Sequence, residues 1–194
     1  ARDPEELKVA LRAALDVGYR LIDTAARYGN EGIIGEVLEE YFNAGKLKRG
    51  DVFITTKLPF TSMAPAEAEA SIEKQLKALR MEYVDLYLIH NPCPMKPKDP
   101  SKTVLSAENF VHQDIPHIDT WKALEKYHKK GVLKAIGLSN FNAKQIQDIY
   151  DQAEVKPANL QVECHIYWSQ FELHELCKKL NMTMTAYGPI GSPG

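Results

Sequence analysis

Helix and strand signals alternate along almost the whole chain, and this order constrains the fold more than any other feature of the sequence. Strand-like apolar runs occupy residues 19–24, 52–56, 84–89, 133–138, 159–162 and 182–187. Segments with apolar residues at helical spacing separate these runs. Parallel strands need such crossover helices, whereas antiparallel strands can be joined by short turns. The alternation therefore predicts an α/β fold with a parallel sheet of six strands. It leaves two architectures open, a doubly wound open sheet and a closed barrel.

Signals at the helix ends support this assignment. Asp3 and Pro4 stand where an N-cap and a first-turn proline begin a helix, and Gly18 stands where a helix commonly ends. Ser169 and Glu172 have the spacing of a capping box ahead of another helical segment. Residues 91–117 are rich in Pro, Lys and Ser, and we expect them to form a long loop that is ordered but adaptable.

Composition and charge exclude several classes of protein. Lys and Arg total 24 against 26 Asp and Glu, so the chain has no general attraction for nucleic acid or an anionic membrane. Three cysteines without CxxC spacing fit a reducing, cytoplasmic compartment. Cys164 and His165 lack a second ligand pair at metal spacing, so we expect no metal. No apolar run approaches the roughly 20 residues that span a bilayer. We expect residues 1–194 to form a single domain.

Four polar residues lie at or just beyond the ends of the first three predicted strands. They are Asp23, Tyr28, Lys57 and His90. Taken singly, each is more simply a surface residue or a hydrogen-bonded core residue. Taken together, they occupy equivalent places in successive strand–helix units, where the carboxyl ends of parallel strands carry active sites. The four positions therefore predict one catalytic site.

These four side chains suit the reduction of a carbonyl group. Negative charge develops on the carbonyl oxygen as hydride arrives, so a proton donor is needed. A tyrosine with a pKa of about 10 holds its proton at neutral pH, and a neighbouring lysine ammonium would stabilise the developing phenolate. An aspartate would hold the lysine charged. A histidine would orient the carbonyl and share in stabilising the oxyanion.

Several segments carry a resemblance to a known family. GYRLIDTAARYGNEGIIGEVL at residues 18–38 and KALEKYHKKGVLKAIGLSNF at 122–141 resemble the two signatures of the aldo-keto reductases. TTKL and LIHNP lie between them, and LQVECHIYW and TAYGPIGSP match two further segments on the cofactor side. The resemblance is closest to the aldose reductase and aldehyde reductase branch. It implies a (β/α)8 TIM barrel, of which this chain supplies about six of the eight units.

The resemblance also implies a role for each residue. Tyr28 would be the general acid, Lys57 and Asp23 its tuning pair, and His90 the group that orients the substrate. The cofactor would be NADPH. The residues placed at the cofactor are Asp23, Ser139, Asn140, Gln161, Tyr187, Gly191 and Ser192. Among these, Ser139 and Asn140 also have an alternative interpretation as a helix N-cap ahead of Ile146.

Two departures from the family pattern concern the substrate pocket. Arg27 falls where relatives often carry an apolar residue. Pointing inward it would favour polar or anionic aldehydes, although we favour an outward, solvated side chain. Asn91 follows His90 where this branch often carries tryptophan, which predicts a less aromatic wall. His90, Asn91 and Arg27 are therefore the predicted substrate-facing residues.

The predicted function is NADPH-dependent reduction of aldehydes and ketones, aldoses included, by a cytoplasmic monomer. One alternative is a structural or regulatory member of the family that binds the cofactor with little catalysis. Another is a barrel isomerase of phosphorylated sugars, against which the absence of a glycine-rich phosphate loop counts. The family's first strand and hairpin, its eighth strand and its C-terminal part have no counterpart here, so we expect a fragment. No residue in the chain supports NADPH over NADH.

Overall fold

A parallel sheet forms the centre of the computed structural model, which describes residues 3–99 and 109–191. Its strands are β1 (Leu21–Asp23), β2 (Phe53–Leu58), β3 (Val84–Ile89), β6 (Leu133–Ser139), β7 (Asn159–Glu163) and β8 (Thr183–Tyr187). They lie in the order β1-β2-β3-β6-β7-β8, and every pair is parallel. Each of these strands is therefore the sheet neighbour of the next along the chain. A doubly wound sheet would reverse direction once, so this order selects the barrel-type arrangement that the sequence alone left open.

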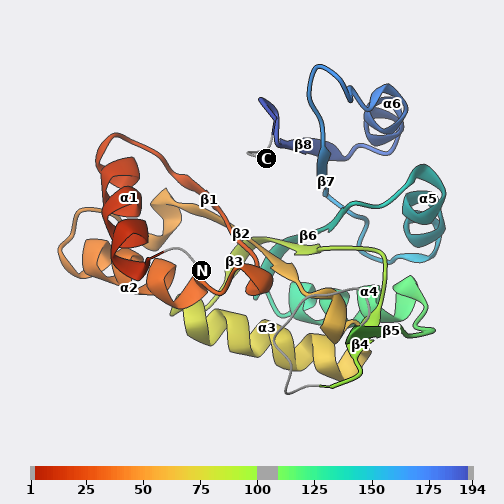
Figure 1. Cartoon of the computed structure of the whole chain (residues 1–194), viewed down its shortest axis with the longest axis horizontal. Coiled ribbons are helices and arrows are strands. Elements are labelled where there is room, and N and C mark those ends of the chain that lie inside the picture. The colour runs from red at the N-terminus through yellow and green to blue at the C-terminus, as the bar shows by residue number, and fades with distance from the viewer. Residues whose placement is uncertain (1–2, 100–108, 192–194) are drawn as a thin grey trace.

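Helices connect the strands and cover the outer side of the curling sheet (Figure 1). They are α1 (Pro4–Asp16), α2 (Glu31–Asn43), α3 (Pro65–Leu79), α4 (His117–Lys129), α5 (Ala143–Gln152) and α6 (Phe171–Lys179). Three short 3-10 helices accompany them, η1 (Ala26–Tyr28), η2 (Arg49–Asp51) and η3 (Phe60–Ser62). None of the helices in the described ranges is long and apolar enough to cross a membrane.

The caps of three helices test the sequence signals. Asp3 caps α1 as predicted, because its side chain accepts a hydrogen bond from the backbone N–H of Glu5. The capping box predicted at Ser169 is wrong. The residue before α6 is Gln170, which has a φ of 53° and makes no capping hydrogen bond. Its side chain instead donates to the carbonyl of Glu163, the last residue of β7. The N-cap of α5 is Asn142, so the alternative interpretation of Ser139 and Asn140 as a cap is also wrong.

The stretch at residues 91–117 contains more regular structure than the predicted loop. Within it, β4 (Met95–Pro97) and β5 (Phe110–His112) form an antiparallel pair, while residues 100–108 lie outside the described part of the chain. Phe110 contacts Phe60 edge to face, with ring centres 5.3 Å apart. A ring nitrogen of His117 lies 2.6 Å from the carbonyl oxygen of Pro92. These contacts attach the hairpin to the carboxyl edge of the sheet.

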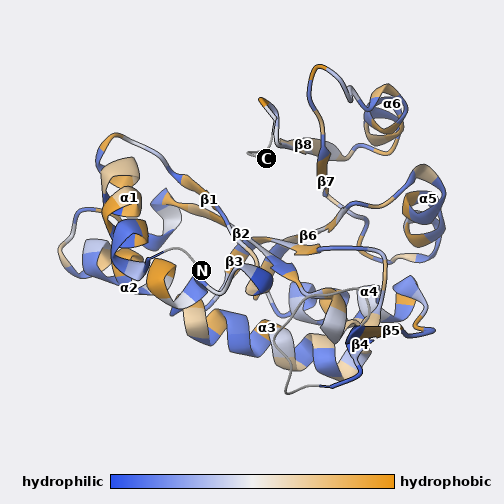
Figure 2. Cartoon of the chain, viewed as in Figure 1, coloured by the Kyte–Doolittle hydropathy of each residue, from blue (hydrophilic) through white to orange (hydrophobic). Residues whose placement is uncertain are grey.

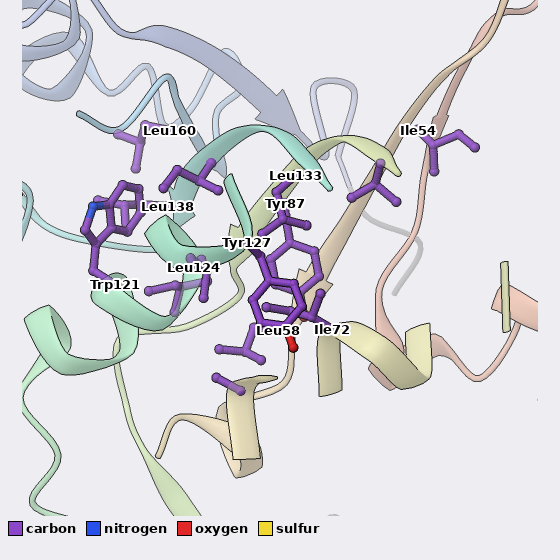
Figure 3. Close-up of a cluster of buried hydrophobic side chains, with 14 of the residues drawn as sticks. Ile54, Leu58, Ile72, Tyr87, Trp121, Leu124, Tyr127, Leu133, Leu138 and Leu160 are labelled. Carbon is purple, nitrogen blue, oxygen red and sulfur yellow. The ribbon is translucent and has the colours of Figure 1, made fainter. Parts of the chain in front are cut away.

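The hydrophobic core lies between the outer face of the sheet and the helices (Figure 3). Ile54 and Leu58 of β2 point to this side and are fully buried, as are Ile72 of α3 and Trp121 of α4. Fully burying a large apolar side chain contributes about 1.5–3 kcal/mol. Hydrophobic residues accordingly concentrate in the strands, whereas the helices also carry many hydrophilic ones, as along α3 (Figure 2). The core thus fixes the strands, and their carboxyl ends with them.

Close packing of α2 against α3 predicts opposite effects of two glycine substitutions on α2. A Cβ added at Gly35 would lie 2.7 Å from the carbonyl oxygen of Ala78, whereas Gly32 has nothing within 4 Å. We expect Gly35→Ala to lower the free energy of unfolding by roughly 1–3 kcal/mol, because backbone must move. Gly32→Ala should raise it by roughly 0.5–1 kcal/mol, because alanine favours the helix. Urea unfolding measures both, and equal stabilisation by the two variants would contradict the packing.

Candidate active site

Lys57 is the most enclosed charged group in the described part of the chain. It lies on the inner face of β2, and only 1% of its side chain is exposed. Its ammonium is hydrogen-bonded to the Asp23 carboxylate and donates to the Thr24 carbonyl at 2.9 Å. The pairing of β1 with β2, in which Asp23 lies beside Thr55, brings these groups together.

The electrostatic environment of Lys57 balances burial against the charge of its partner. Burial lowers the pKa of Lys57, and the Asp23 carboxylate opposes that shift by favouring the charged ammonium. The second carboxylate oxygen of Asp23 accepts a hydrogen bond from the Gln161 amide at 2.7 Å. Asp23 therefore connects the lysine on β2 with Gln161 in the middle of β7 across the concave side of the sheet.

Tyr28 stands at the edge of this cluster on η1, and 51% of the residue is exposed. The Lys57 ammonium lies 5.4 Å from the centre of its ring. The ring of His90 meets it edge to face, with centres 5.8 Å apart. Burial and the charge of Asp23 raise the pKa of the Tyr28 hydroxyl above its usual value. The phenol therefore keeps its proton at neutral pH and can donate it to a group at the mouth of the site.

His90 follows β3, and its backbone N–H donates to the carbonyl of Leu58 at 3.2 Å. Burial, together with the positive charges of Lys57 and Arg27, lowers the pKa of His90 to about 4. The imidazole is therefore neutral at physiological pH. A neutral imidazole has one N–H donor and one acceptor nitrogen, so it can donate a hydrogen bond to a carbonyl oxygen without carrying charge.

Asn140, which follows β6, is hydrogen-bonded to residues at the ends of β3 and β8. It has a φ of 64°, in the left-handed region that asparagine tolerates better than most residues. Its amide nitrogen donates to the His90 carbonyl at 2.9 Å and to the Asn91 side chain at 3.3 Å. Its side-chain oxygen accepts from the Tyr187 hydroxyl at 2.8 Å. Asn140 thus connects the predicted cofactor residues to the predicted catalytic ones.

Two more predicted cofactor residues belong to the same edge of the sheet. Ser139 ends β6, and its hydroxyl accepts a hydrogen bond from Asn140 at 3.2 Å. Gln161 lies beside it in the β6–β7 register. Both side chains are buried. The Asn140 N–H donates to the Gln161 carbonyl at 3.0 Å, so one continuous set of hydrogen bonds connects Asp23, Ser139, Asn140, Gln161 and Tyr187.

The remaining predicted site residues are Gly191, Ser192 and Arg27. Gly191 occupies an exposed turn after β8, in which its N–H donates to the Gly188 carbonyl. Ser192 lies outside the described residues. Arg27 is exposed, its guanidinium lies 5.4 Å from the centre of the Phe60 ring, and its charge acts on both Tyr28 and His90. There it lines a cavity of about 650 Å³ between α3, the first turn of α2 and the helices η1 and η3.

The structure adds buried polar residues that the sequence analysis did not single out. The Thr24 carbonyl accepts a hydrogen bond from the Lys57 ammonium. Glu31 and Gln75, on α2 and α3, form a buried hydrogen-bonded group with Thr56 directly behind the lysine. A signal for Gln75 existed, because it occupies a position in helical register with Ile72 and Leu79 on the apolar face of α3. Within residues 3–99 and 109–191, no three His, Cys, Asp or Glu side chains gather as a metal ion would require.

Sequence comparison places the chain in a family. The model of the aldo/keto reductase family matches residues 1–194. The chain belongs to this family. Its fold is accordingly the incomplete (β/α)8 barrel that the sequence predicts, with consecutive parallel strands curling around a concave inner face.

Named relatives and solved structures agree with this assignment. The chain is 47% identical over 197 residues to "Aldo-keto reductase family 1 member A1-A" of Danio rerio. It is 45% identical over 198 residues to "Aldo-keto reductase family 1 member A1" of Gallus gallus. Each alignment covers 98% of this chain but 59% of the relative, so the chain spans about three-fifths of the relatives' length.

The structural matches show the same partial coverage. The aldose reductase of Schistosoma japonicum superimposes with a TM-score of 0.90 at 43% identity, covering 97% of this chain and 62% of that one. The aldose reductase of Giardia lamblia gives a TM-score of 0.91 at 32% identity, covering 98% and 63%. The likeness therefore extends over nearly the whole of this chain and under two-thirds of each solved structure.

The lowered pKa of His90 predicts a dependence of stability on pH. The folded-state pKa of about 4 lies below the usual value of 6.5, so the unfolded state binds the proton first as the pH falls. Stability linked to His90 is therefore intact above about pH 6.5 and is lost as the pH falls towards 4. We expect the free energy of unfolding to decline less steeply over this range in His90→Gln than in the wild type. Denaturant unfolding measures both slopes. An NMR signal assigned to the His90 imidazole that titrates near 6.5 in the folded protein would contradict the prediction.

Proposed function

We propose that the protein containing this chain reduces aldehydes and ketones, aldoses included, to alcohols with NADPH. The observation that carries the proposal is the enclosed Lys57 ammonium, paired with Asp23, beside a half-exposed Tyr28 that retains its proton. Burying a charge beside a protonated phenol costs folding free energy, and groups held in this way cluster at functional sites, where they can stabilise negative charge that appears on the phenol. Family membership supports the same reaction class.

In this proposal Tyr28 is the general acid. As the carbonyl carbon of the substrate accepts hydride, its oxygen takes the proton from the Tyr28 hydroxyl. The Lys57 ammonium stabilises the phenolate that remains, and Asp23 keeps the ammonium charged. His90, neutral at physiological pH, donates a hydrogen bond to the substrate oxygen and orients it. The alcohol product thereby gains one hydrogen on the carbonyl carbon, from the hydride, and one on the oxygen, from Tyr28.

The residues near Asn140 fit a nicotinamide cofactor. Amide and hydroxyl groups of Ser139, Asn140 and Gln161 meet at one edge, and these groups can pair with both the donor and the acceptor of a carboxamide. The ring of Tyr187, 39% exposed, offers a flat apolar face for an aromatic ring beside them. NADPH would supply the hydride when bound. The preference for NADPH, and pyrophosphate contacts at Gly191 and Ser192, rest on the family resemblance.

The substrate would be a small carbonyl compound held at the outer edge of the same site. His90, Asn91 and Arg27 are the residues we propose to face it. Asn91 is held through Asn140, which supports a polar wall next to His90. The positive charge of Arg27 acts on both Tyr28 and His90, which supports its proximity to the reacting groups. A cytoplasmic monomer is the form we propose, as the resemblance implies.

Replacing Tyr28 by phenylalanine tests the proposal. In the longest natural chain that contains these residues, Tyr28→Phe should lower the kcat for NADPH-dependent reduction of an aromatic aldehyde by about 10²–10⁴-fold, because the proton donor is lost. NADPH affinity, measured by fluorescence quenching, should change little. Absorbance at the NADPH band reports turnover.

Tyr19→Phe serves as the control for that experiment, because Tyr19 is exposed in the segment before β1. It should leave kcat unchanged. A wild-type protein that binds NADPH tightly but reduces none of several aldehydes and ketones would contradict the proposed function. That result would favour a cofactor-binding family member without catalysis.

A further inference from the structure

We propose that a set of polar residues around the first turn of α2 is a positioning device for Lys57. The device, which we call the α2 bracket, consists of Thr24, Asn30, Glu31, Thr56 and Gln75. The bracket has two parts, which we call arms. One arm holds the carbonyl that accepts a hydrogen bond from the lysine ammonium, and the other holds the backbone of the lysine. The inference rests on the proposed function, because it assigns these residues to the geometry of a catalytic lysine.

The first arm runs from Asn30 to the acceptor of the ammonium. The buried Thr24 hydroxyl donates to the side-chain oxygen of Asn30 at 2.6 Å. The Thr24 N–H donates to the Thr55 carbonyl at 2.8 Å, and the Thr24 carbonyl accepts the Lys57 ammonium at 2.9 Å. Asn30 therefore holds the residue that determines where the end of the lysine lies.

The second arm runs from Glu31 to the backbone of the lysine. One Glu31 carboxylate oxygen accepts from the Thr56 hydroxyl at 2.5 Å and from the Gln75 amide at 2.8 Å. The Gln75 amide nitrogen also lies 3.2 Å from the Lys57 carbonyl oxygen, to which it donates. Thr56 immediately precedes Lys57, so both contacts act on the same short piece of β2. The base of the lysine is thereby tied to α2 and α3 together.

A neighbouring strand completes the arm. The Tyr87 hydroxyl of β3 donates to the Gln75 side-chain oxygen at 2.5 Å, and the Ser71 hydroxyl donates to the same oxygen at 3.2 Å. Both ends of the Gln75 amide thus have partners, which fixes its orientation. Connected buried hydrogen bonds of this kind hold one geometry more strictly than the separate bonds would.

Glu31 shows that packing alone does not account for the bracket. The residue is 7% exposed, and burial raises the pKa of its carboxyl group. Burying a carboxyl group costs free energy that an apolar side chain of similar size would not. Its place in the first turn of α2 offsets part of that cost through the helix dipole. The Glu31 carboxylate provides a fixed acceptor for the Thr56 hydroxyl and the Gln75 amide, which an apolar side chain could not provide.

The position of Lys57 matters because its ammonium must face Asp23 and the Tyr28 ring at once. Misplacing a catalytic group by about 1 Å can cost about 10²-fold in rate. Loosening either arm should therefore lower kcat and leave cofactor binding almost unchanged. It should also admit reagents to an ammonium that the fold otherwise encloses.

Asn30 offers the sharpest test, because its side chain makes no capping hydrogen bond to α2. In the longest natural chain containing these residues, we expect Asn30→Ala to lower kcat at least about fivefold, with the KM for NADPH within about threefold of wild type. Asn30→Asp keeps the acceptor oxygen and should restore most of kcat. The rate of trinitrophenylation at Lys57, measured by peptide mass spectrometry, should rise at least about threefold in Asn30→Ala but not in Asn30→Asp.

Substitutions at Glu31 test the second arm in the same assays. Glu31→Leu should lower kcat about tenfold or more and speed modification of Lys57, whereas Glu31→Gln keeps an acceptor and should remain within about threefold of wild type. Glu40→Leu is the control, because Glu40 lies on the same helix, is exposed and pairs with Arg12. Glu40→Leu should change neither kcat nor the rate of Lys57 modification.

Unchanged kcat and unchanged Lys57 modification in folded Asn30→Ala and Glu31→Leu would overturn the inference. A loss of thermal stability without either change would assign the bracket to folding alone. The modification rate separates this inference from the proposed function, because it needs no catalysis. An inactive wild type with a Lys57 that Asn30→Ala exposes would reject the function and retain the bracket.

Discussion

The pairing of the enclosed Lys57 ammonium with Asp23 and Thr24 is the interaction on which the rest of the site depends. The Lys57 side chain is almost fully buried, and its charge is met by a carboxylate from β1 and a carbonyl just beyond that strand. A charge in this position is tolerated only while those partners stay in place, because an unpaired buried ion is strongly destabilising. The β1–β2 register therefore has a chemical consequence as well as a structural one. It brings Asp23 to the lysine, and through Asp23 it reaches Gln161 on β7.

Successive side chains of β2 point alternately to the hydrophobic core beside the helices and to the concave inner side of the sheet. Ile54 and Leu58 face the helices and belong to the core, whereas Thr55 and Lys57 face the concave side. Thr56 faces the helices as well, but it enters a polar group with α2 and α3. The same strand thus anchors the sheet by apolar burial and the lysine by hydrogen bonds. Rigid support of this kind is what a site needs if its reacting groups are to be held before substrate arrives.

The alternating pattern predicted every strand of the main sheet, because apolar runs and helical spacing are local properties of the sequence. The choice between barrel and doubly wound sheet was not local, since it depends on which strands become neighbours. Asp23 and Lys57 could be singled out as candidate site residues from their places at strand ends. Their direct contact was not, because it depends on register. Glu31 escaped prediction for a similar reason: a glutamate in a first helical turn has the pattern of an exposed residue, and only the approach of α3 buries it.

The most direct measurement of the central claim is a double-mutant cycle on kcat/KM for carbonyl reduction, using Tyr28→Phe, Lys57→Met and the double variant. If the lysine acts through the tyrosine, removing it after the phenol is gone should cost little further, and the two losses should be strongly non-additive. We expect the double variant to lie within about threefold of Tyr28→Phe alone. Losses that multiply across the cycle would contradict it, because Lys57 would then act on the reaction independently of Tyr28.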